Sequence, residues 1–151
     1  VANKYMFKCP LNIVILSHGN ERKFAKLLVN QEYARYIDAW IKSVDKGFYS
    51  VPYSYRKGSH QKEAKFNPDF FIKIREDILV VEVKSDEDIT EINRAKLKYA
   101  KRHFSDLNKK LQKRKYYFKF LSPQDFRPFF EAVKKGKHRE YITNLEAELK
   151  L

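Results

Sequence analysis

The stretch FNPDFFIKIREDILVVEVK, residues 66–84, places two apolar segments on either side of a short charged one. Residues 66–74 and 78–84 have the length and composition of strands, and Arg75-Glu76-Asp77 has the polarity of a turn, so the sequence predicts a hairpin. Alternate residues of 78–83 point to opposite faces and both sets are apolar, which is typical of a strand covered on both sides. We therefore expect an α/β fold in which helices flank both faces of a mixed β-sheet.

Three ionisable residues stand in this otherwise apolar hairpin: Asp69, Glu82 and Lys84. Because side chains alternate along a strand, Glu82 and Lys84 are expected on the same face. If the turn holds an even number of residues, Asp69 lies directly opposite Glu82, whereas a slip of one residue would send the two carboxylates to opposite faces. The predicted register is the even one.

Two carboxylates this close repel each other, by ~1 kcal/mol in water and ~4 kcal/mol near a protein surface. A divalent cation removes that penalty, and Mg²⁺ prefers carboxylates together with waters and phosphate oxygens. Such a metal polarises a phosphate and lowers the pKa of a bound water, while Lys84 can hold that water or stabilise negative charge. Asp69, Glu82 and Lys84 are therefore predicted to form a metal-dependent centre for phosphodiester hydrolysis, with Mg²⁺ as cofactor and Mn²⁺ as a substitute.

Several motifs resemble those of a known group of nucleases. Pro68-Asp69, followed by Glu82-Val83-Lys84 behind the apolar residues 78–81, resembles the PD-(D/E)xK nuclease superfamily. Further segments make the chain similar to the C-terminal endonuclease domain of the restriction (Res) subunit of type III restriction-modification enzymes, over roughly residues 17–120. These segments are Asn20-Glu21-Arg22-Lys23-Phe24, Val51-Pro52-Tyr53 and Phe66-Asn67-Pro68-Asp69-Phe70.

The resemblance implies a restriction-endonuclease-like core and Mg²⁺-dependent cleavage of double-stranded DNA, as restriction of foreign DNA. It also implies two partners: a helicase-like motor region upstream that hydrolyses ATP, and a DNA methyltransferase (modification) subunit that reads the sequence. The chain contains no GxxxxGK[ST] pattern, so ATP is expected to serve only a motor region outside it. The start at Val1 rather than Met fits a domain excised from a larger helicase-nuclease.

Glu21 has two interpretations. It stands in the first turn of a helix predicted over residues 21–29, where an acid favours the helix dipole. The resemblance makes it instead a catalytic acid and a third metal ligand beside Asp69 and Glu82. The histidines show no metal-ligand spacing, although His18 lies near Glu21 in sequence.

The remaining pattern predicts one endonuclease domain over residues 1–151, with a core at about 17–121 and a C-terminal helical extension at about 122–151. An amphipathic stretch is expected over residues 32–42, and a capping box at Asp88–Glu91 is expected to start the longest helix. The other expected elements are strands at 48–55 and 116–121, a loop at 56–65, a helix ending near Lys115, one from Ser122-Pro123 to Gly136, and a last helix from about Arg139.

The net charge of +13 indicates a polyanionic partner. No apolar run approaches the ~20 residues that a membrane span needs, and no signal peptide is visible, which favours nucleic acid over a membrane. Cys9 is the only cysteine, so an internal disulfide is excluded and a reducing, cytoplasmic setting is the expectation. Four residues are the candidates for contacts with the DNA backbone: Arg56, Lys57, Lys65 and Lys96.

Two alternatives remain open at this point. One is a DNA repair nuclease or junction resolvase of the same superfamily, and the other is a non-catalytic nucleic-acid-binding module. An RNA substrate also stays open, because nothing in the sequence reads a 2′-hydroxyl.

Overall fold

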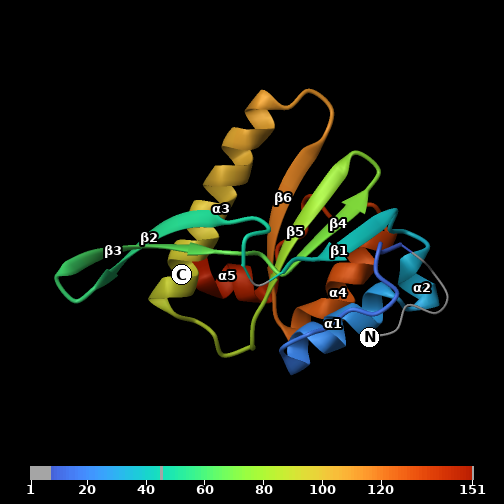
Figure 1. Ribbon diagram of the computed structural model, residues 1–151, viewed down its shortest axis with the longest axis horizontal. Helices are drawn as coiled ribbons and strands as arrows, with labels where there is room; N and C mark the ends of the chain where they lie inside the picture. The colour runs from blue at the N-terminus through green and yellow to red at the C-terminus, as the bar shows by residue number, and fades with distance from the viewer. Residues whose placement is uncertain (1–7, 45, 151) are drawn as a thin grey trace.

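The computed structural model describes residues 8–44 and 46–150. Within these residues the chain forms five helices and six strands (Figure 1). In chain order they are α1 Gly19–Leu28, α2 Gln31–Ala34, β1 Ala39–Lys42, β2 Val51–Lys57, β3 His60–Phe66, β4 Phe70–Ile74, β5 Asp77–Val83, α3 Glu91–Lys110, β6 Lys115–Leu121, α4 Pro123–Lys134 and α5 Asn144–Lys150. None of the helices in this described part is long and apolar enough to cross a bilayer.

The central sheet has four strands in the order β1-β4-β5-β6. The pairs β1–β4 and β4–β5 are antiparallel, whereas β5 and β6 run parallel. A parallel pair requires a crossover connection, and α3 supplies it between β5 and β6. The predicted mixed sheet in an α/β arrangement is therefore confirmed.

A two-residue turn, Arg75-Glu76, joins β4 to β5. Arg75 adopts a positive φ of 54°, as the first position of a tight hairpin turn of this hand requires. The sequence pattern predicted that Asp77 belongs to the turn, and this prediction is wrong. Asp77 begins β5 and pairs with Ile74. Its carboxylate contacts His138 and Arg139, and these partners allow an acid to be buried at the start of the strand.

The even register of this hairpin is confirmed. Phe70 pairs with Val81, so the next position along the ladder places Asp69 across from Glu82. The backbone N–H of Asp69 donates to the carbonyl of Val81 at 2.9 Å, which extends the pairing one residue beyond β4.

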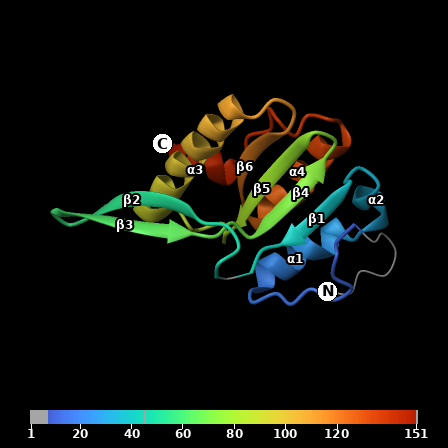
Figure 2. The ribbon, with the colours of Figure 1, turned by 45° about the horizontal axis from the view of Figure 1, so that its top comes forward.

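Helices cover both faces of the sheet, as the two apolar faces of β5 predicted. On one face, Val81 packs in a cluster with residues of α1 and α4, including Phe24 and Phe129. On the other face, Val80 packs with residues of α3 and α5, including Phe104. Figures 1 and 2 show the sheet between these two helical layers.

The segment predicted as a C-terminal extension, residues 122–151, is integral to the core. Phe129 and Phe130 of α4 are fully buried against one face of the sheet, and Leu145 of α5 is fully buried against the other. The last helix begins at Asn144 rather than near Arg139, because Arg139 binds Asp77 at the far end of β5. Truncation at residue 121 would therefore expose both hydrophobic clusters.

The amphipathic stretch predicted over residues 32–42 divides into α2 and β1. Its apolar spacing suits a helix, but Trp40 pairs with Ile72 of β4, and pairing with an existing strand overrides the local pattern. Lys42, the last residue of β1, pairs with Phe70 and is thereby brought beside Asp69.

The prediction of a loop over residues 56–65 is wrong. Strands β2 and β3 form a hairpin through a two-residue turn at Gly58-Ser59, with Gly58 at a φ of 63°. Most of β3 is exposed, so its sequence lacks the apolar alternation that marks a half-buried strand. The strand predicted over residues 66–74 is also interrupted, since β3 ends at Phe66 and Pro68 precedes the start of β4.

The predicted capping box at Asp88–Glu91 is wrong as well. Thr90 is the residue that caps α3, and its hydroxyl accepts from the N–H of Asn93 at 3.2 Å. The carboxylate of Asp88 instead accepts from the N–H of Ser85 at 3.1 Å and closes the loop after β5. The helix ends at Lys110, five residues before the predicted end at Lys115, where β6 begins.

Candidate active site

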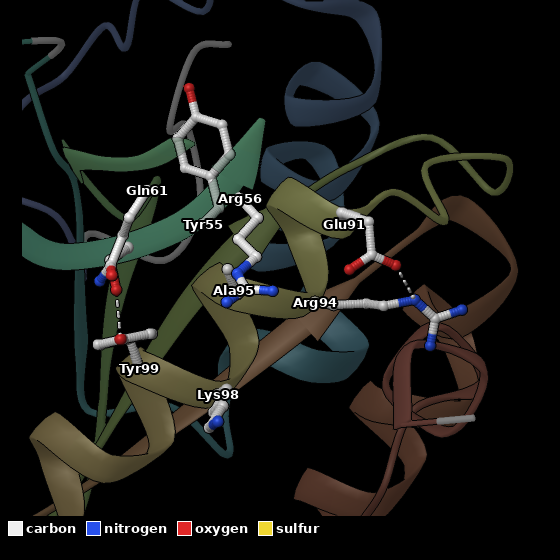
Figure 3. Close-up of a pocket in the computed structure, with 9 residues that line it drawn as sticks. Tyr55, Arg56, Gln61, Glu91, Arg94, Ala95, Lys98 and Tyr99 are labelled. Atoms are coloured by element: carbon white, nitrogen blue, oxygen red, sulfur yellow. Dashed lines mark hydrogen bonds and ion pairs between the residues drawn. The ribbon is translucent and has the colours of Figure 1, made fainter. Parts of the chain in front are cut away.

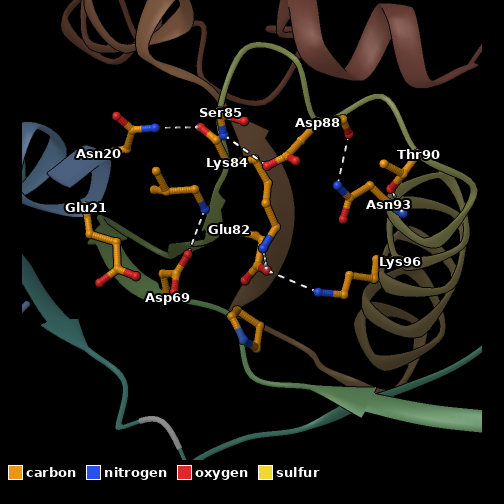
Figure 4. Close-up of polar contacts among 12 residues, drawn as sticks. Asn20, Glu21, Asp69, Glu82, Lys84, Ser85, Asp88, Thr90, Asn93 and Lys96 are labelled. Carbon is orange, nitrogen blue, oxygen red and sulfur yellow. Dashed lines mark hydrogen bonds and ion pairs between the residues drawn. The ribbon is translucent and has the colours of Figure 1, made fainter. Parts of the chain in front are cut away.

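The candidate site lies at the carboxyl end of β5. Glu82 is 4% exposed, although its strand neighbours are apolar. The Nζ atom of Lys84 lies 3.0 Å from Oε1 of Glu82, and the Nζ atom of Lys96 on α3 lies 3.6 Å from the same oxygen (Figure 4). Two ammonium groups from different elements therefore converge on one buried carboxylate, and the predicted pair of Glu82 and Lys84 on one face is confirmed.

Asp69 reaches this site from the neighbouring strand. Its Oδ2 atom accepts a hydrogen bond from the backbone N–H of Val83 at 2.7 Å, which orients the carboxylate across the hairpin. Its backbone is held as well, because the N–H and the hydroxyl of Ser43 both donate to the carbonyl of Asp69, at 2.9 and 3.2 Å. Asp69 is thus held from both sides of β4, its carboxylate by Val83 and its backbone carbonyl by Ser43.

Glu21 also faces the site rather than bulk solvent. It stands in the first turn of α1 and is 5% exposed. The adjacent Asn20 side chain donates to the carbonyl of Lys84 at 3.4 Å, which ties the start of α1 to the end of β5. Figure 4 shows Glu21, Asp69 and Glu82 in succession across the site.

Lys42 is a member of the site that the sequence pattern did not reveal. Its Nζ atom lies 3.5 Å from Oε2 of Glu21 and 3.6 Å from Oδ1 of Asp69, and its side chain is 9% exposed. The signal that would have found it is the pairing of residues 39–42 with β4, which places a lysine next to Asp69. The amphipathic pattern of residues 32–42 concealed that pairing.

Burial raises the pKa of all three acids, and the negative charge of Asp69 adds to this shift for Glu82 and Glu21. Burial is the largest cause for Glu82, followed by the negative charge of Asp69, and together they raise its pKa to about 7 despite Lys84. Burial and the charge of Asp69 raise the pKa of Glu21. Burial raises the pKa of Asp69 too, although the hydrogen bond from Val83 opposes that shift.

The two lysines beside Glu82 respond in opposite directions. Burial lowers the pKa of Lys84, but the Glu82 carboxylate outweighs it, so the pKa of Lys84 is raised overall. Burial dominates for Lys96 and lowers its pKa, because Glu82 lies farther from it and Lys84 adds a like charge. Lys84 therefore holds its proton more strongly than Lys96 does.

Two carboxylate oxygens in the site are buried without a hydrogen-bond partner among the described residues: Oε2 of Glu82 and Oε2 of Glu21. The ammonium of Lys42 lies within ion-pair distance of the latter, but the contact lacks hydrogen-bond geometry. Buried acceptors of this kind are costly unless something positive meets them. Over residues 8–44 and 46–150, however, no group of three or more His, Cys, Asp or Glu side chains is arranged to hold a metal ion.

A small pocket of about 250 Å³ opens beside the acids. Glu21 and Lys84 line it, together with Asn20 and with the loop residues Ser85 and Asp88. His18, the histidine nearest to Glu21 in sequence, lines the same pocket. The start of α1 and the end of β5 therefore border an opening at Glu21 and Lys84, which Asp69 and Glu82 do not line.

The four residues predicted to contact DNA occupy two different settings. Lys96 lies in the site itself, with Nζ 5.0 Å from the centre of the Phe66 ring. Arg56, Lys57 and Lys65 are exposed on the β2–β3 hairpin, which extends away from the central sheet (Figures 1 and 2). Of these four predicted residues, only Lys96 contacts an acid of the site.

A larger pocket of about 440 Å³ lies between this hairpin and α3 (Figure 3). Arg56 of β2 and Lys98 of α3 line it from opposite sides. The hydroxyls of Ser54 and Tyr99 form a hydrogen bond across its wall. This pocket and the candidate site share α3, because Lys96 faces the acids from the same helix.

Comparisons of the chain with protein-family models, with curated proteins and with solved structures return no match. The arrangement of Asp69, Glu82 and Lys84 is therefore the basis for a functional interpretation.

Proposed function

We propose that the chain is a Mg²⁺-dependent DNA endonuclease domain that hydrolyses phosphodiester bonds at Asp69, Glu82 and Lys84. The observation that carries the proposal is the 3.0 Å contact between Lys84 and the buried Glu82, with Asp69 across the hairpin from it. A solvent-exposed hairpin would leave these charges free, whereas here Glu82 is buried at the end of a core strand, in contact with the partly buried Lys84 and across the hairpin from the partly buried Asp69. The cost of that arrangement supports a role in chemistry over a role in solubility.

The donor set fits a divalent cation. Asp69 and Glu82 supply carboxylate oxygens, and Oε2 of Glu82 has no hydrogen-bond partner among the described residues. Mg²⁺ is commonly held by one or two carboxylates together with waters and substrate oxygens, so a third protein acid is not required. A divalent cation bound there would neutralise negative charge on the phosphate and lower the pKa of an attacking water.

Lys84 acts as a fixed positive charge in this proposal. Its pKa is raised by Glu82, so its ammonium stays protonated at neutral pH. An ammonium that must carry its proton suits the stabilisation of a non-bridging phosphate oxygen, not the removal of a proton from water. Lys96, with a lowered pKa, approaches the same Oε1 atom of Glu82 from α3 and supports the ionised form of this acid.

DNA as the substrate is supported by charge and shape. The net charge of +13 favours a polyanion, and Arg56, Lys57 and Lys65 are exposed on the β2–β3 hairpin, which extends away from the central sheet (Figure 2). Contacts with the phosphate backbone are independent of sequence and strengthen at low salt. The pocket between the hairpin and α3 adds Arg56 and Lys98 to that basic surface.

The narrower assignment rests on the motif resemblance alone. We propose a PD-(D/E)xK restriction-endonuclease-like core from the restriction subunit of a type III restriction-modification enzyme. That assignment brings an upstream ATP-driven motor and a DNA methyltransferase subunit as partners. It also predicts that sequence recognition lies outside this chain.

Incubation of the 151-residue chain with supercoiled plasmid tests the proposal. Nicked or linear DNA should form with Mg²⁺ or Mn²⁺ and not with EDTA, and single-stranded RNA should stay intact. Binding of DNA without cleavage in any metal would favour a non-catalytic nucleic-acid-binding module instead. Selective cutting of four-way junctions would favour a junction resolvase.

A further inference from the structure

Lys42 sits between Glu21 and Asp69, and the proposed function assigns Asp69 to metal binding. Its ammonium contacts the carboxylates of Glu21 and Asp69 and donates to its neighbour's carbonyl, that of Ser43, at 3.2 Å. The Phe70 ring lies 5.6 Å from Nζ, measured to the ring centre. The positive charge is therefore placed where Glu21 and Asp69 would otherwise face each other unscreened.

The geometry of these contacts is loose. Distances of 3.5 and 3.6 Å exceed the ~2.7–2.9 Å of a charge-assisted hydrogen bond between an ammonium and a carboxylate. By contrast, Lys101 lies 2.7 Å from the buried Glu146 at the contact between α3 and α5, which is a tight structural ion pair. Lys42 is thus held by the field of two acids and not by directed hydrogen bonds to them.

We infer that Lys42 is a built-in substitute cation that neutralises Glu21 and Asp69 before a divalent metal binds, and that the metal must displace it. The inference rests on the proposed metal-dependent function. It explains why the buried Glu21 and Glu82 lie close to the partly buried Asp69, although no three-acid ligand group is formed within the described residues. The flexible four-carbon stem of a lysine allows its ammonium to withdraw without movement of β1.

A competing cation lowers the apparent affinity of the site for a metal, because the metal binds only after the ammonium has left. The flanking acids repel each other less while Lys42 is present, so the same residue stabilises the metal-free fold. Removal of its charge should therefore weaken the metal-free protein and strengthen metal binding. A purely structural ion pair would show the first effect without the second.

The test is isothermal titration of the 151-residue chain with MgCl₂ and with MnCl₂ at constant ionic strength. Lys42→Met removes the charge and keeps most of the stem, Lys42→Gln is a second neutral variant in case the first fails to fold, and Lys42→Arg keeps the charge. Lys101→Met is the matched control, because it breaks a lysine–acid pair outside the site. Thermal unfolding in EDTA and in saturating Mg²⁺ supplies a second measurement.

We expect Lys42→Met and Lys42→Gln to bind Mg²⁺ about tenfold tighter than the unmodified chain, which corresponds to ~1.4 kcal/mol. Both should unfold at a lower temperature in EDTA and gain more from Mg²⁺, since a ligand stabilises more strongly as its affinity rises. Lys42→Arg and Lys101→Met should bind Mg²⁺ as the unmodified chain does.

Equal or weaker Mg²⁺ affinity in both neutral variants would overturn the inference. If the unmodified chain still bound Mg²⁺ in that experiment, the proposed function would stand and Lys42 would be a permanent structural partner. If neither the unmodified chain nor the variants bound Mg²⁺ or Mn²⁺, the metal-dependent function would fail together with the inference.

Discussion

Glu82 of β5 and Lys84, the first residue after that strand, form an ion pair of 3.0 Å in which the carboxylate is almost completely buried. Only Oε1 of Glu82 receives the ammonium groups of Lys84 and Lys96. Its Oε2 is left without a hydrogen bond among the described residues. The Glu82 carboxylate therefore combines one oxygen that is paired with cations and one that has no hydrogen-bond partner among the described residues.

Lys96→Met should slow DNA cleavage about tenfold to a hundredfold and leave the fold intact. The reduction follows because Glu82 would keep only one of its two cationic partners and would ionise less readily. Lys110→Met is the control, since Lys110 is exposed in the last turn of the same helix. Initial rates of plasmid cleavage measure the effect, and equal rates for the two variants would remove Lys96 from the site.

The stability of the metal-free chain should fall as pH rises from about 4.5 to about 7, in part because of Glu82. Its folded-state pKa of about 7 exceeds its ordinary value of 4.5, so its contribution is full below pH 4.5 and is lost as pH rises through 7. Glu82→Gln imitates the protonated acid at every pH. We expect this variant to match the unmodified chain at pH 4 and to exceed its unfolding free energy at pH 8 by ~1–3 kcal/mol.

Urea unfolding in EDTA at both pH values checks this expectation. The comparison with Glu82→Gln isolates Glu82 from the other titrating groups, because they are common to both proteins. A difference between the two proteins that does not change with pH would contradict the raised pKa.

Binding of the chain to duplex DNA should be weak, independent of sequence and strongly dependent on salt. If the chain neutralises six phosphates, the affinity should fall roughly a thousandfold between 50 and 200 mM salt. Substitution of Arg56, Lys57 and Lys65 by alanine should lower the salt slope by about one for each phosphate that is no longer neutralised. The fold should persist, because all three side chains are exposed on the hairpin.

Fluorescence anisotropy over a salt series provides the measurement. The matched control replaces three exposed basic residues of α4 and the turn that follows it: Arg127, Lys135 and Lys137. An equal decrease of affinity in the two triple variants would show that the hairpin has no special role. A clear preference for one duplex sequence would contradict the expectation that recognition lies elsewhere.

Asp77→Asn should destabilise the chain by about 1–3 kcal/mol at neutral pH. At the amino end of β5, the Asp77 carboxylate receives two hydrogen bonds from Arg139, at 2.7 and 2.9 Å, and lies 2.7 Å from Nε2 of His138. Burial raises the pKa of Asp77, but the hydrogen bonds from Arg139 and His138 outweigh it, and the pKa is lowered overall. This contribution is therefore present above the ordinary pKa of 3.8 and is lost as pH falls through the folded-state pKa.

Thermal unfolding at pH 7 measures the effect of Asp77→Asn. Asp106→Asn is the control, because Asp106 is exposed on α3 and pairs with Lys109 at 2.8 Å at the surface. A destabilisation no larger than that of the control would mean that the Asp77 cluster does not anchor the loop between α4 and α5.

The sequence predicted the central hairpin because its signal is local. Residues 78–83 are apolar on both faces, the turn is short, and the register of Asp69 and Glu82 follows from counting residues through that turn. These features need no knowledge of which distant segments pair. The position of Glu21 beside this hairpin was expected from the motif resemblance, and in the structure Glu21 and Asp69 both contact Lys42.

The parts that sequence reasoning did not reveal depend on distant pairing. Lys42 becomes a site residue only because β1 pairs with β4. The sequence of residues 32–42 contains no signal that identifies β4 as the paired strand. The β3 strand escaped detection because it is exposed, and exposed strands lack an apolar alternation. The C-terminal segment was predicted to be an extension outside the core, because an amphipathic pattern does not show where a helix packs. In the structure, Phe129 and Phe130 belong to one hydrophobic cluster and Leu145 to the other.

Plasmid cleavage with Mg²⁺ by three single variants tests the central claim most directly. Asp69→Asn, Glu82→Gln and Lys84→Met should each slow cleavage by about 10²–10³-fold, since each removes one group that acts on the scissile phosphate. Asp106→Asn should cleave normally, and all four should keep the circular dichroism and the DNA affinity of the unmodified chain. Cleavage at the unmodified rate by Glu82→Gln or by Lys84→Met would contradict the claim that these residues form the catalytic centre.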